Sequence, residues 1–220
     1  MIAPERPDRR ETIRYLGGAG VEMNAEMERL MDDCEKQLLA CARPKYLYKI
    51  LELPQDSLTE GEDIRRHLAG CSRAVVMCAT LGAEVDRLIR VAQVRDMAQA
   101  VVLDAMASVA VEQVCARLDE RIMAENPGWF MTFRFSPGYG DYPISLQKTF
   151  LRLLDAQRKI GLSVSDSLLL IPAKSVTAVA GLSASPVPRG RRGCAVCSLR
   201  ETCQYRRNGE HCGFENTVKE

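Results

Sequence analysis

The residues from Asp96 to about Ala124 form the stretch that most restricts how this chain can fold. Apolar residues in it recur at helical spacing and surround nearly the whole circumference of the predicted helix. A helix of this kind is buried on most sides, so other elements have to cover it. With 220 residues and 46% hydrophobic content, the chain is large enough to do so.

Apolar runs on both sides of this helix predict strands. The run Ala74–Gly82 is continuous, which is typical of a central strand covered on both faces. Further strands are predicted at Ile13–Leu16, Tyr46–Leu53, Trp129–Phe133, Ser167–Ile171 and Ser175–Leu182, and further helices at 22–42, Glu60–Leu68, Ala83–Ala92 and 145–158. Helices and strands alternate, which predicts an α/β or α+β fold with a mixed twisted sheet and long helices.

Three polar residues interrupt the long apolar helix. Asp104, Ser108 and Glu112 repeat every four residues, which places them on one face. That stripe faces either water or a polar cavity, and the pattern leaves both interpretations open. His67, near the end of a short predicted helix, has no visible metal partner, so a surface or capping role is expected for it.

The segment Arg134–Tyr139 is the clearest candidate for ligand binding. Arg134 supplies a cation at a strand end, where loops commonly hold ligands. Pro137 stiffens the loop, Gly138 lets backbone N–H groups approach a bound molecule, and Tyr139 adds an aromatic face. Such a loop suits a small anionic or zwitterionic molecule with a flat ring, although an isolated R-x-x-x-G-Y string is more often an ordinary turn.

Several stretches around this segment carry a family resemblance: Phe133–Pro143, Lys148 with the helix Thr149–Gln157, Gly161, Ser167–Pro172 and Ser175–Thr177. Together they resemble the activation domain of cobalamin-dependent methionine synthase, which binds S-adenosylmethionine. A weaker similarity extends back through the preceding long helix. The R-x-x-x-G-Y element is specific in this context, whereas the apolar strands are not.

The resemblance implies a binding site for S-adenosylmethionine at Glu112, Arg134, Gly138 and Tyr139. Arg134 is expected to bind the carboxylate of the methionine moiety, and Glu112 to approach the cationic end of the ligand. No catalytic base is expected, because a sulfonium methyl group is already activated. Two departures from the family pattern are expected to weaken the adenosine pocket: Tyr142–Ser145 stands in place of Cys-Pro-x-His, and Ala180 in place of an aromatic residue.

The implied function is that of a free-standing reactivation module, a component of the methionine synthase (methyltransferase) system and so of methionine biosynthesis. Such modules support the reductive methylation of cob(II)alamin. Nothing in the chain resembles a cobalamin-binding domain, so the corrinoid is expected on a partner methionine synthase or another corrinoid methyltransferase, with a reductase as electron donor.

Charge and composition exclude other classes of partner. The 30 basic and 29 acidic residues give a net charge of +1, so neither nucleic acid nor an anionic membrane is expected as a partner. No apolar run approaches the ~18 residues that a membrane span needs. The segment Met1–Arg10 lacks the apolar core of a signal peptide, so a cytoplasmic location is expected.

The nine cysteines divide into two groups. Five lie in apolar surroundings, where reduced cysteines are expected to pack in the core: Cys34, Cys41, Cys71, Cys78 and Cys115. The other four follow a boundary rich in Pro, Gly and Arg, so residues 1–185 are predicted to form the activation-like domain and residues 186–220 a Cys-rich tail.

The tail has the spacing of a metal site. Cys194 and Cys197 form a C-x2-C pair, Cys203 follows after five residues, and Cys212 after eight more. Four thiolates can bind zinc or an iron–sulfur cluster, and spacing alone does not separate the two metals. His211 is an alternative fourth ligand, and an unligated tail with reactive thiols is a third interpretation.

The tail also opens two alternative functions. In one, a metal cluster there transfers electrons and reactivates a corrinoid protein, while the ligand pocket is vestigial. In the other, zinc stabilises a non-catalytic subunit of a methyltransferase complex.

Overall fold

The computed structural model describes residues 4–17 and 23–187, so the Cys-rich tail and its predicted ligands Cys194, Cys197, Cys203 and Cys212 lie outside the described residues. The helices are α1 (Arg9–Tyr15), α2 (Ala25–Cys41), α3 (Glu62–His67), α4 (Ala83–Arg95), α5 (Met97–Glu125), α6 (Leu146–Leu154) and α7 (Ala156–Ile160). The strands are β1 (Lys45–Glu52), β2 (Arg73–Thr80), β3 (Phe130–Met131), β4 (Ser163–Val164), β5 (Leu170–Ile171) and β6 (Ser175–Ser183). A 3₁₀ helix, η2 (Asp56–Leu58), follows β1.

The main sheet has four strands in the order β1-β2-β6-β3, and every neighbouring pair is antiparallel. Its register places Met77 of β2 opposite Tyr48 of β1 and Ala178 of β6. The two short strands β4 and β5 form a separate hairpin. The protein is therefore an α+β fold with long helices, as the sequence predicts, but its main sheet is antiparallel rather than mixed.

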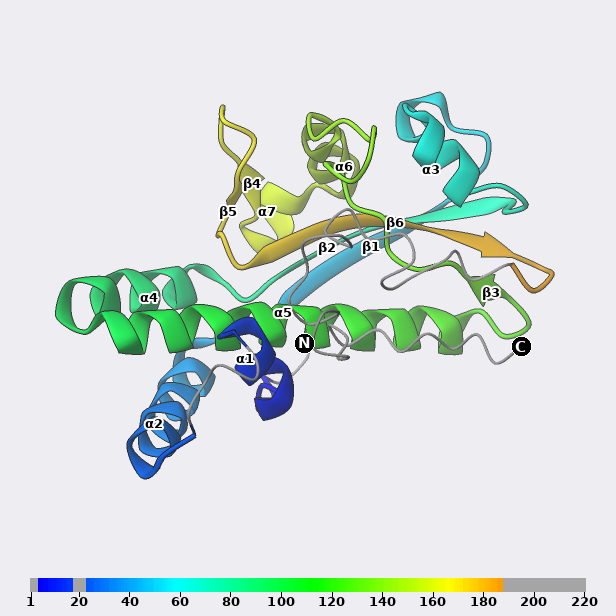
Figure 1. Ribbon diagram of the computed structural model, residues 1–220. Helices are drawn as coiled ribbons and strands as arrows, with labels where there is room; N and C mark the ends of the chain where they lie inside the picture. The colour runs from blue at the N-terminus through cyan, green and yellow to red at the C-terminus, as the bar shows by residue number, and fades with distance from the viewer. Residues whose placement is uncertain (1–3, 18–22, 188–220) are drawn as a thin grey trace.

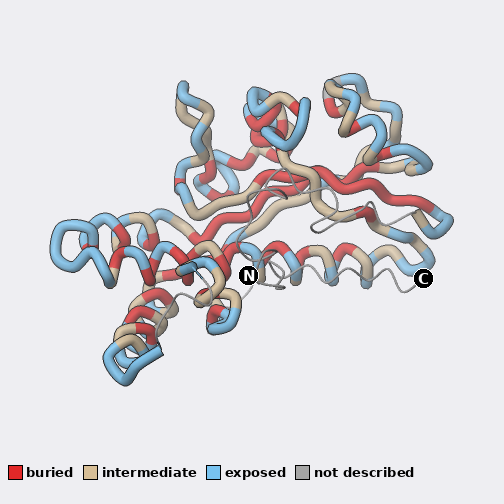
Figure 2. The backbone as a smooth tube through the Cα atoms, viewed as in Figure 1, coloured by how far each residue is buried: buried red, intermediate tan, exposed pale blue. Residues whose placement is uncertain are grey.

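Two helical layers cover the two faces of this sheet (Figure 1). The long helix α5 lies along one face, with α1, α2 and α4 packed around it, and α3, α6, α7 and the β4–β5 hairpin cover the other. The sheet between the layers is mostly buried, and the exposed residues lie on the outer sides of the helices (Figure 2). Each interface buries apolar side chains, with Met77 on the α5 side and Val76 on the opposite side.

Helix α5 is buried on most sides, which confirms the prediction from its sequence. Its buried residues run from Ala100 to Ile122. The helix begins after Asp96, whose side chain accepts hydrogen bonds from the N–H groups of Ala98 and Gln99 and so satisfies two donors of the first turn. The placement of α5 matters for the candidate site, because residues on the exposed stripe of this helix reach the loop that follows β3.

The prediction of a strand at Ile13–Leu16 is wrong, because these residues belong to helix α1 and its C-cap. Asp8 caps that helix by accepting a hydrogen bond from Glu11 N, and Arg14 pairs with Glu11 along its surface. These local polar contacts, together with packing against α5, outweigh the β propensity of the short apolar run.

Three other elements differ from their predictions in extent. Strand β3 covers only Phe130–Met131 of the five-residue run predicted, and β5 covers only Leu170–Ile171 of the predicted Ser167–Ile171. The helix predicted over 145–158 is broken at Asp155, which adopts the left-handed conformation with φ 54° and separates α6 from α7. The remaining predicted helices and strands are present with shifted ends.

The five cysteines outside the tail are free thiols within the fold. Cys34, Cys78 and Cys115 are buried, while Cys41 and Cys71 are half-buried. Burial raises the pKa of Cys34 to about 11 and that of Cys78 and Cys115 to about 12. These three thiols are core residues, as predicted. None of the helices within the described residues is sufficiently long and apolar to span a bilayer.

Candidate functional site

Arg134 lies where the chain leaves β3 and touches β6 once more. The backbone of Phe135 exchanges two hydrogen bonds with Val179 of β6, at 2.8 and 2.9 Å. Side chains alternate along such an extended segment. Phe133 and Phe135 therefore contact the α3 and α6 side of the sheet, whereas Arg134 reaches α5 on the opposite side.

The guanidinium of Arg134 pairs with two carboxylates of α5. Its Nη2 lies 2.7 Å from Oε2 of Glu112, and its Nη1 donates to Oδ2 of Asp119. Glu112 and Asp119 are seven residues apart, so they lie on the same helical face two turns from each other. Arg134 thus anchors the loop after β3 to α5 through one cation and two anions.

The three charged groups of this cluster differ in their exposure to solvent. The side chain of Arg134 is 21% exposed, compared with 48% for Glu112 and 26% for Asp119. Burial alone would lower the pKa of Arg134, but the charge of Asp119 and then those of Cys115 and Glu112 raise it above its usual value. Arg134 stays charged, so the three ionised groups, one cation and two anions, sum to one negative charge.

The polar stripe on α5 has partners along its length. Lys174, which precedes β6, places its Nζ 2.8 Å from Oδ1 of Asp104 and 2.9 Å from Oγ of Ser108. Glu112, the third residue of the stripe, binds Arg134. The stripe therefore faces two cations supplied by the loops around β6.

Gly138 and Tyr139 belong to the same loop as Arg134. Gly138 adopts a φ of 97°, which favours glycine, and its N–H donates to the carbonyl of Tyr142 at 2.8 Å. The N–H of Tyr139 donates to the carbonyl of Ser136. Both N–H groups are thus engaged within the turn. The ring of Tyr139 is 56% exposed and meets Phe135 edge-on at 5.8 Å, so an aromatic face remains accessible beside the loop.

His67, at the end of α3, contacts the backbone beside Arg134, which a surface or capping role does not describe. Its Nε2 lies 2.9 Å from the carbonyl oxygen of Phe133 and 2.9 Å from Oγ1 of Thr132. Its ring centroid lies 4.4 Å from that of Phe133 and 5.0 Å from that of Phe135. Sequence reasoning missed this contact because its partners are more than sixty residues away in the chain.

The other end of the loop is attached to the start of α3. The two carboxylate oxygens of Asp141 accept hydrogen bonds from the N–H groups of Glu62 and Asp63, at 2.6 and 3.0 Å. These bonds hold the pKa of Asp141 below its usual value. The buried hydroxyl of Tyr142 donates to the carbonyl of Leu58 at 2.9 Å. Tyr142 is thus a structural residue of the loop.

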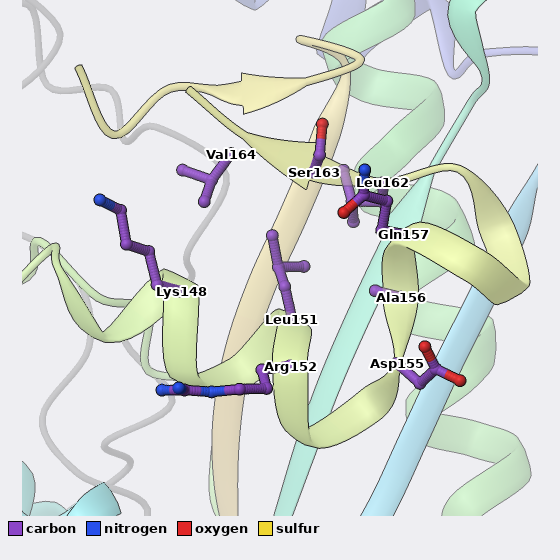
Figure 3. A pocket seen from close by; sticks show the side chains of 9 residues that line it. All are labelled: Lys148, Leu151, Arg152, Asp155, Ala156, Gln157, Leu162, Ser163 and Val164. Carbon is purple, nitrogen blue, oxygen red and sulfur yellow. The ribbon is translucent and has the colours of Figure 1, made fainter. Parts of the chain in front are cut away.

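Among the described residues, a concave pocket of about 350 Å³ lies elsewhere, between α6, α7 and β4 (Figure 3). Its lining includes Lys148 and Arg152, whose charged ends extend to the same side of α6, and an apolar floor that includes Leu151 and Leu162. None of the four residues predicted to bind a ligand lines it. The candidate site around Arg134, at the edge of the sheet, is separate from this pocket.

A comparison with solved structures finds the MetH reactivation domain, in a crystal structure with AdoHcy (S-adenosylhomocysteine) bound. The similarity covers 85% of this chain and 74% of that chain, with a TM-score of 0.55 and 16% sequence identity. This chain shares the fold of that reactivation domain. No family model and no curated protein matches the sequence.

Of the four residues predicted for the site, the structure brings Glu112 and Arg134 into direct contact and places Gly138 and Tyr139 farther along the same loop. Asp119 was missed, although its seven-residue spacing from Glu112 was visible in the sequence. Ala180 is fully buried on β6 and presents no ring to a ligand. Within the described ranges, no cluster of His, Cys, Asp or Glu is arranged to hold a metal ion.

Proposed function

We propose that the chain is a reactivation module that binds S-adenosylmethionine at Arg134 and supports the reductive methylation of cob(II)alamin. The corrinoid would be carried by a partner methionine synthase or another corrinoid methyltransferase, and a reductase would supply the electron. The observation that carries the proposal is the Arg134–Glu112–Asp119 cluster, in a fold shared with the MetH reactivation domain.

The cluster suits the charge distribution of this ligand. S-adenosylmethionine carries a carboxylate, an ammonium group and a sulfonium group. The guanidinium of Arg134 is the complement of the carboxylate, because its planar donors match two carboxylate oxygens. The carboxylates of Glu112 and Asp119 complement the two cationic groups. The excess negative charge of the cluster favours a ligand with a net positive charge.

Binding would require an exchange at Arg134, because both carboxylates of α5 already contact it. Glu112 is the more exposed of the two, so its movement away from the guanidinium costs less than that of Asp119. The ligand carboxylate would then take the place of Glu112 on Arg134, and Glu112 would be free to face the ammonium or sulfonium group. Asp119 would keep the guanidinium in position throughout.

The contribution of the chain to the reaction would be binding and orientation. A sulfonium methyl group needs no further activation, and the reduced cobalt of the partner would be the nucleophile. Held at Arg134, the ligand would present its methyl group at the edge of the sheet, and the partner would have to dock against that edge.

The proposal is tested by calorimetric titration of Glu112→Gln and the wild type with S-adenosylmethionine and with S-adenosylhomocysteine, which lacks the sulfonium charge. At a distance of about 8 Å and an intermediate effective dielectric constant, the attraction between one excess negative charge of the protein and the sulfonium contributes about 1 kcal/mol to binding. The wild type should therefore prefer S-adenosylmethionine about fivefold. Glu112→Gln should remove most of this preference.

Arg121→Ala is a matched control, because Arg121 pairs with Glu125 of α5 away from the candidate site. It should leave both affinities unchanged. Equal affinities of the wild type for the two ligands would contradict the proposed role of Glu112, and the absence of binding to either would contradict the proposed function. A corrinoid methyltransferase, a reductant and S-adenosylmethionine should then give methylcobalamin only when the chain is present.

A further inference from the structure

We infer that helix α3 clamps the ligand-binding loop and that His67 is the positioning residue that sets the place of Arg134. This inference rests on the proposed function for its effect on ligand affinity, but the clamp itself is a property of the free protein. Two independent attachments carry it, one at each end of α3.

The first attachment fixes the backbone immediately before Arg134. The carbonyl oxygen of Phe133 only accepts hydrogen bonds, so the Nε2 of His67, 2.9 Å away, must carry a proton and donate it. Thr132 joins the same network through its Oγ1, which also accepts the N–H of Gly181 at 2.8 Å. The imidazole thus links α3 to the two residues that precede Arg134 and, through Thr132, to β6.

The second attachment fixes the chain immediately after Tyr139 and Gly140. Asp141 accepts two backbone hydrogen bonds at the start of α3, and its own N–H donates to Oδ2 of Asp63 at 3.3 Å. The loop between Arg134 and Tyr139 is therefore held at both of its ends by one short helix. A shift of α3 would move the guanidinium and the aromatic ring together.

Helix α3 is itself fixed against the sheet. Leu68, its C-cap, is buried, and it approaches β6 at Gly181, where an added Cβ would lie 3.1 Å from Cδ2 of Leu68 and 3.0 Å from Cβ of Cys71. This close packing gives the imidazole of His67 a defined distance from the loop. The ring contacts with Phe133 and Phe135 restrict its rotation further.

Three variants test the inference. His67→Ala removes the hydrogen bond to Phe133, and His67→Gln keeps an N–H donor of similar reach. Arg87→Ala is the control, because Arg87 is exposed on α4 and pairs with Glu84, away from the loop and from α3. Each is titrated with S-adenosylhomocysteine, each thermal midpoint is recorded, and the Nε–H signal of Arg134 is followed by NMR without ligand.

His67→Ala should lose at least about fivefold in affinity, while His67→Gln should recover most of it and Arg87→Ala should match the wild type. The Nε–H signal of Arg134 should shift or broaden in His67→Ala alone. The clamp is refuted if that signal and the affinity do not change in His67→Ala, or if affinity only follows the thermal midpoint across the variants. A wild type that binds no ligand would contradict the proposed function, and the NMR signal would still test the clamp.

Discussion

Replacement of Arg134 by alanine separates the structural role of this residue from its role in binding. In the free protein Arg134 joins the loop after β3 to α5 through Glu112 and Asp119. In the proposed complex it also binds the ligand carboxylate. The two roles predict losses of different size in two different measurements.

The structural loss follows from the exposure of the two pairs. Glu112 is half-exposed, so its pair contributes about 0.5 kcal/mol to folding. Asp119 is more deeply placed, and removal of its partner leaves a poorly solvated charge, which costs about 1–2 kcal/mol. Arg134→Ala should therefore lower the free energy of unfolding by about 2 kcal/mol, or the thermal midpoint by about 4–8 °C.

Arg134→Ala should also weaken ligand binding. A charge-assisted hydrogen bond to the ligand carboxylate contributes about 1.5–3 kcal/mol, so the dissociation constant should rise tenfold or more. Arg134→Lys keeps the charge but not the planar donors, and it should recover part of the affinity. Calorimetry well below the thermal midpoint measures this loss on folded protein. Unchanged affinity in Arg134→Ala would remove Arg134 from the binding site.

Three further predictions concern the scaffold of the site. The pKa of Asp141 in the folded protein lies below its usual value of 3.8. The ionised carboxylate therefore stabilises the fold fully at pH values above 3.8, and this stabilisation is lost as the pH falls through the lower folded-state pKa. Asp141→Asn should therefore lower the thermal midpoint near neutral pH and have little effect in strong acid. Gly181→Ala should destabilise the protein by about 1–3 kcal/mol in urea denaturation, because the added Cβ crowds Cys71. With iodoacetamide at about pH 8, the buried Cys78 and Cys115 should stay unmodified while the half-buried Cys41 and Cys71 react, as mass spectrometry of the digested protein would detect.

The sequence predicts the elements of the fold better than their ends. The buried run in β2 and the apolar circumference of α5 have long, unambiguous patterns, and both are confirmed. The four residues Ile13–Leu16 have a β-like composition, but capping by Asp8 and contacts with α5 decide for a helix. A short run carries too little pattern to outweigh such contacts.

The site is partly visible in the sequence. Arg134 and Glu112, both named as candidates from the sequence, are in contact in the structure, and the spacing of Asp119 extends the same helical face. The contribution of α3 is not visible, because His67 and Asp141 act through backbone groups more than sixty residues away. A backbone carbonyl has no signature in the side-chain pattern, so only the fold reveals these attachments.

The most direct test of the account is a calorimetric titration of the wild type with S-adenosylmethionine, on protein purified without oxygen and with its visible spectrum recorded beforehand. The account predicts a dissociation constant in the micromolar range that rises tenfold or more in Arg134→Ala. No measurable binding by the intact, folded protein would contradict it. If the protein does not bind the ligand but carries a coloured metal centre, the result would favour the alternative in which a metal cluster transfers electrons to reactivate a corrinoid protein. If it does not bind the ligand and is colourless, the result would favour the zinc-stabilised non-catalytic subunit.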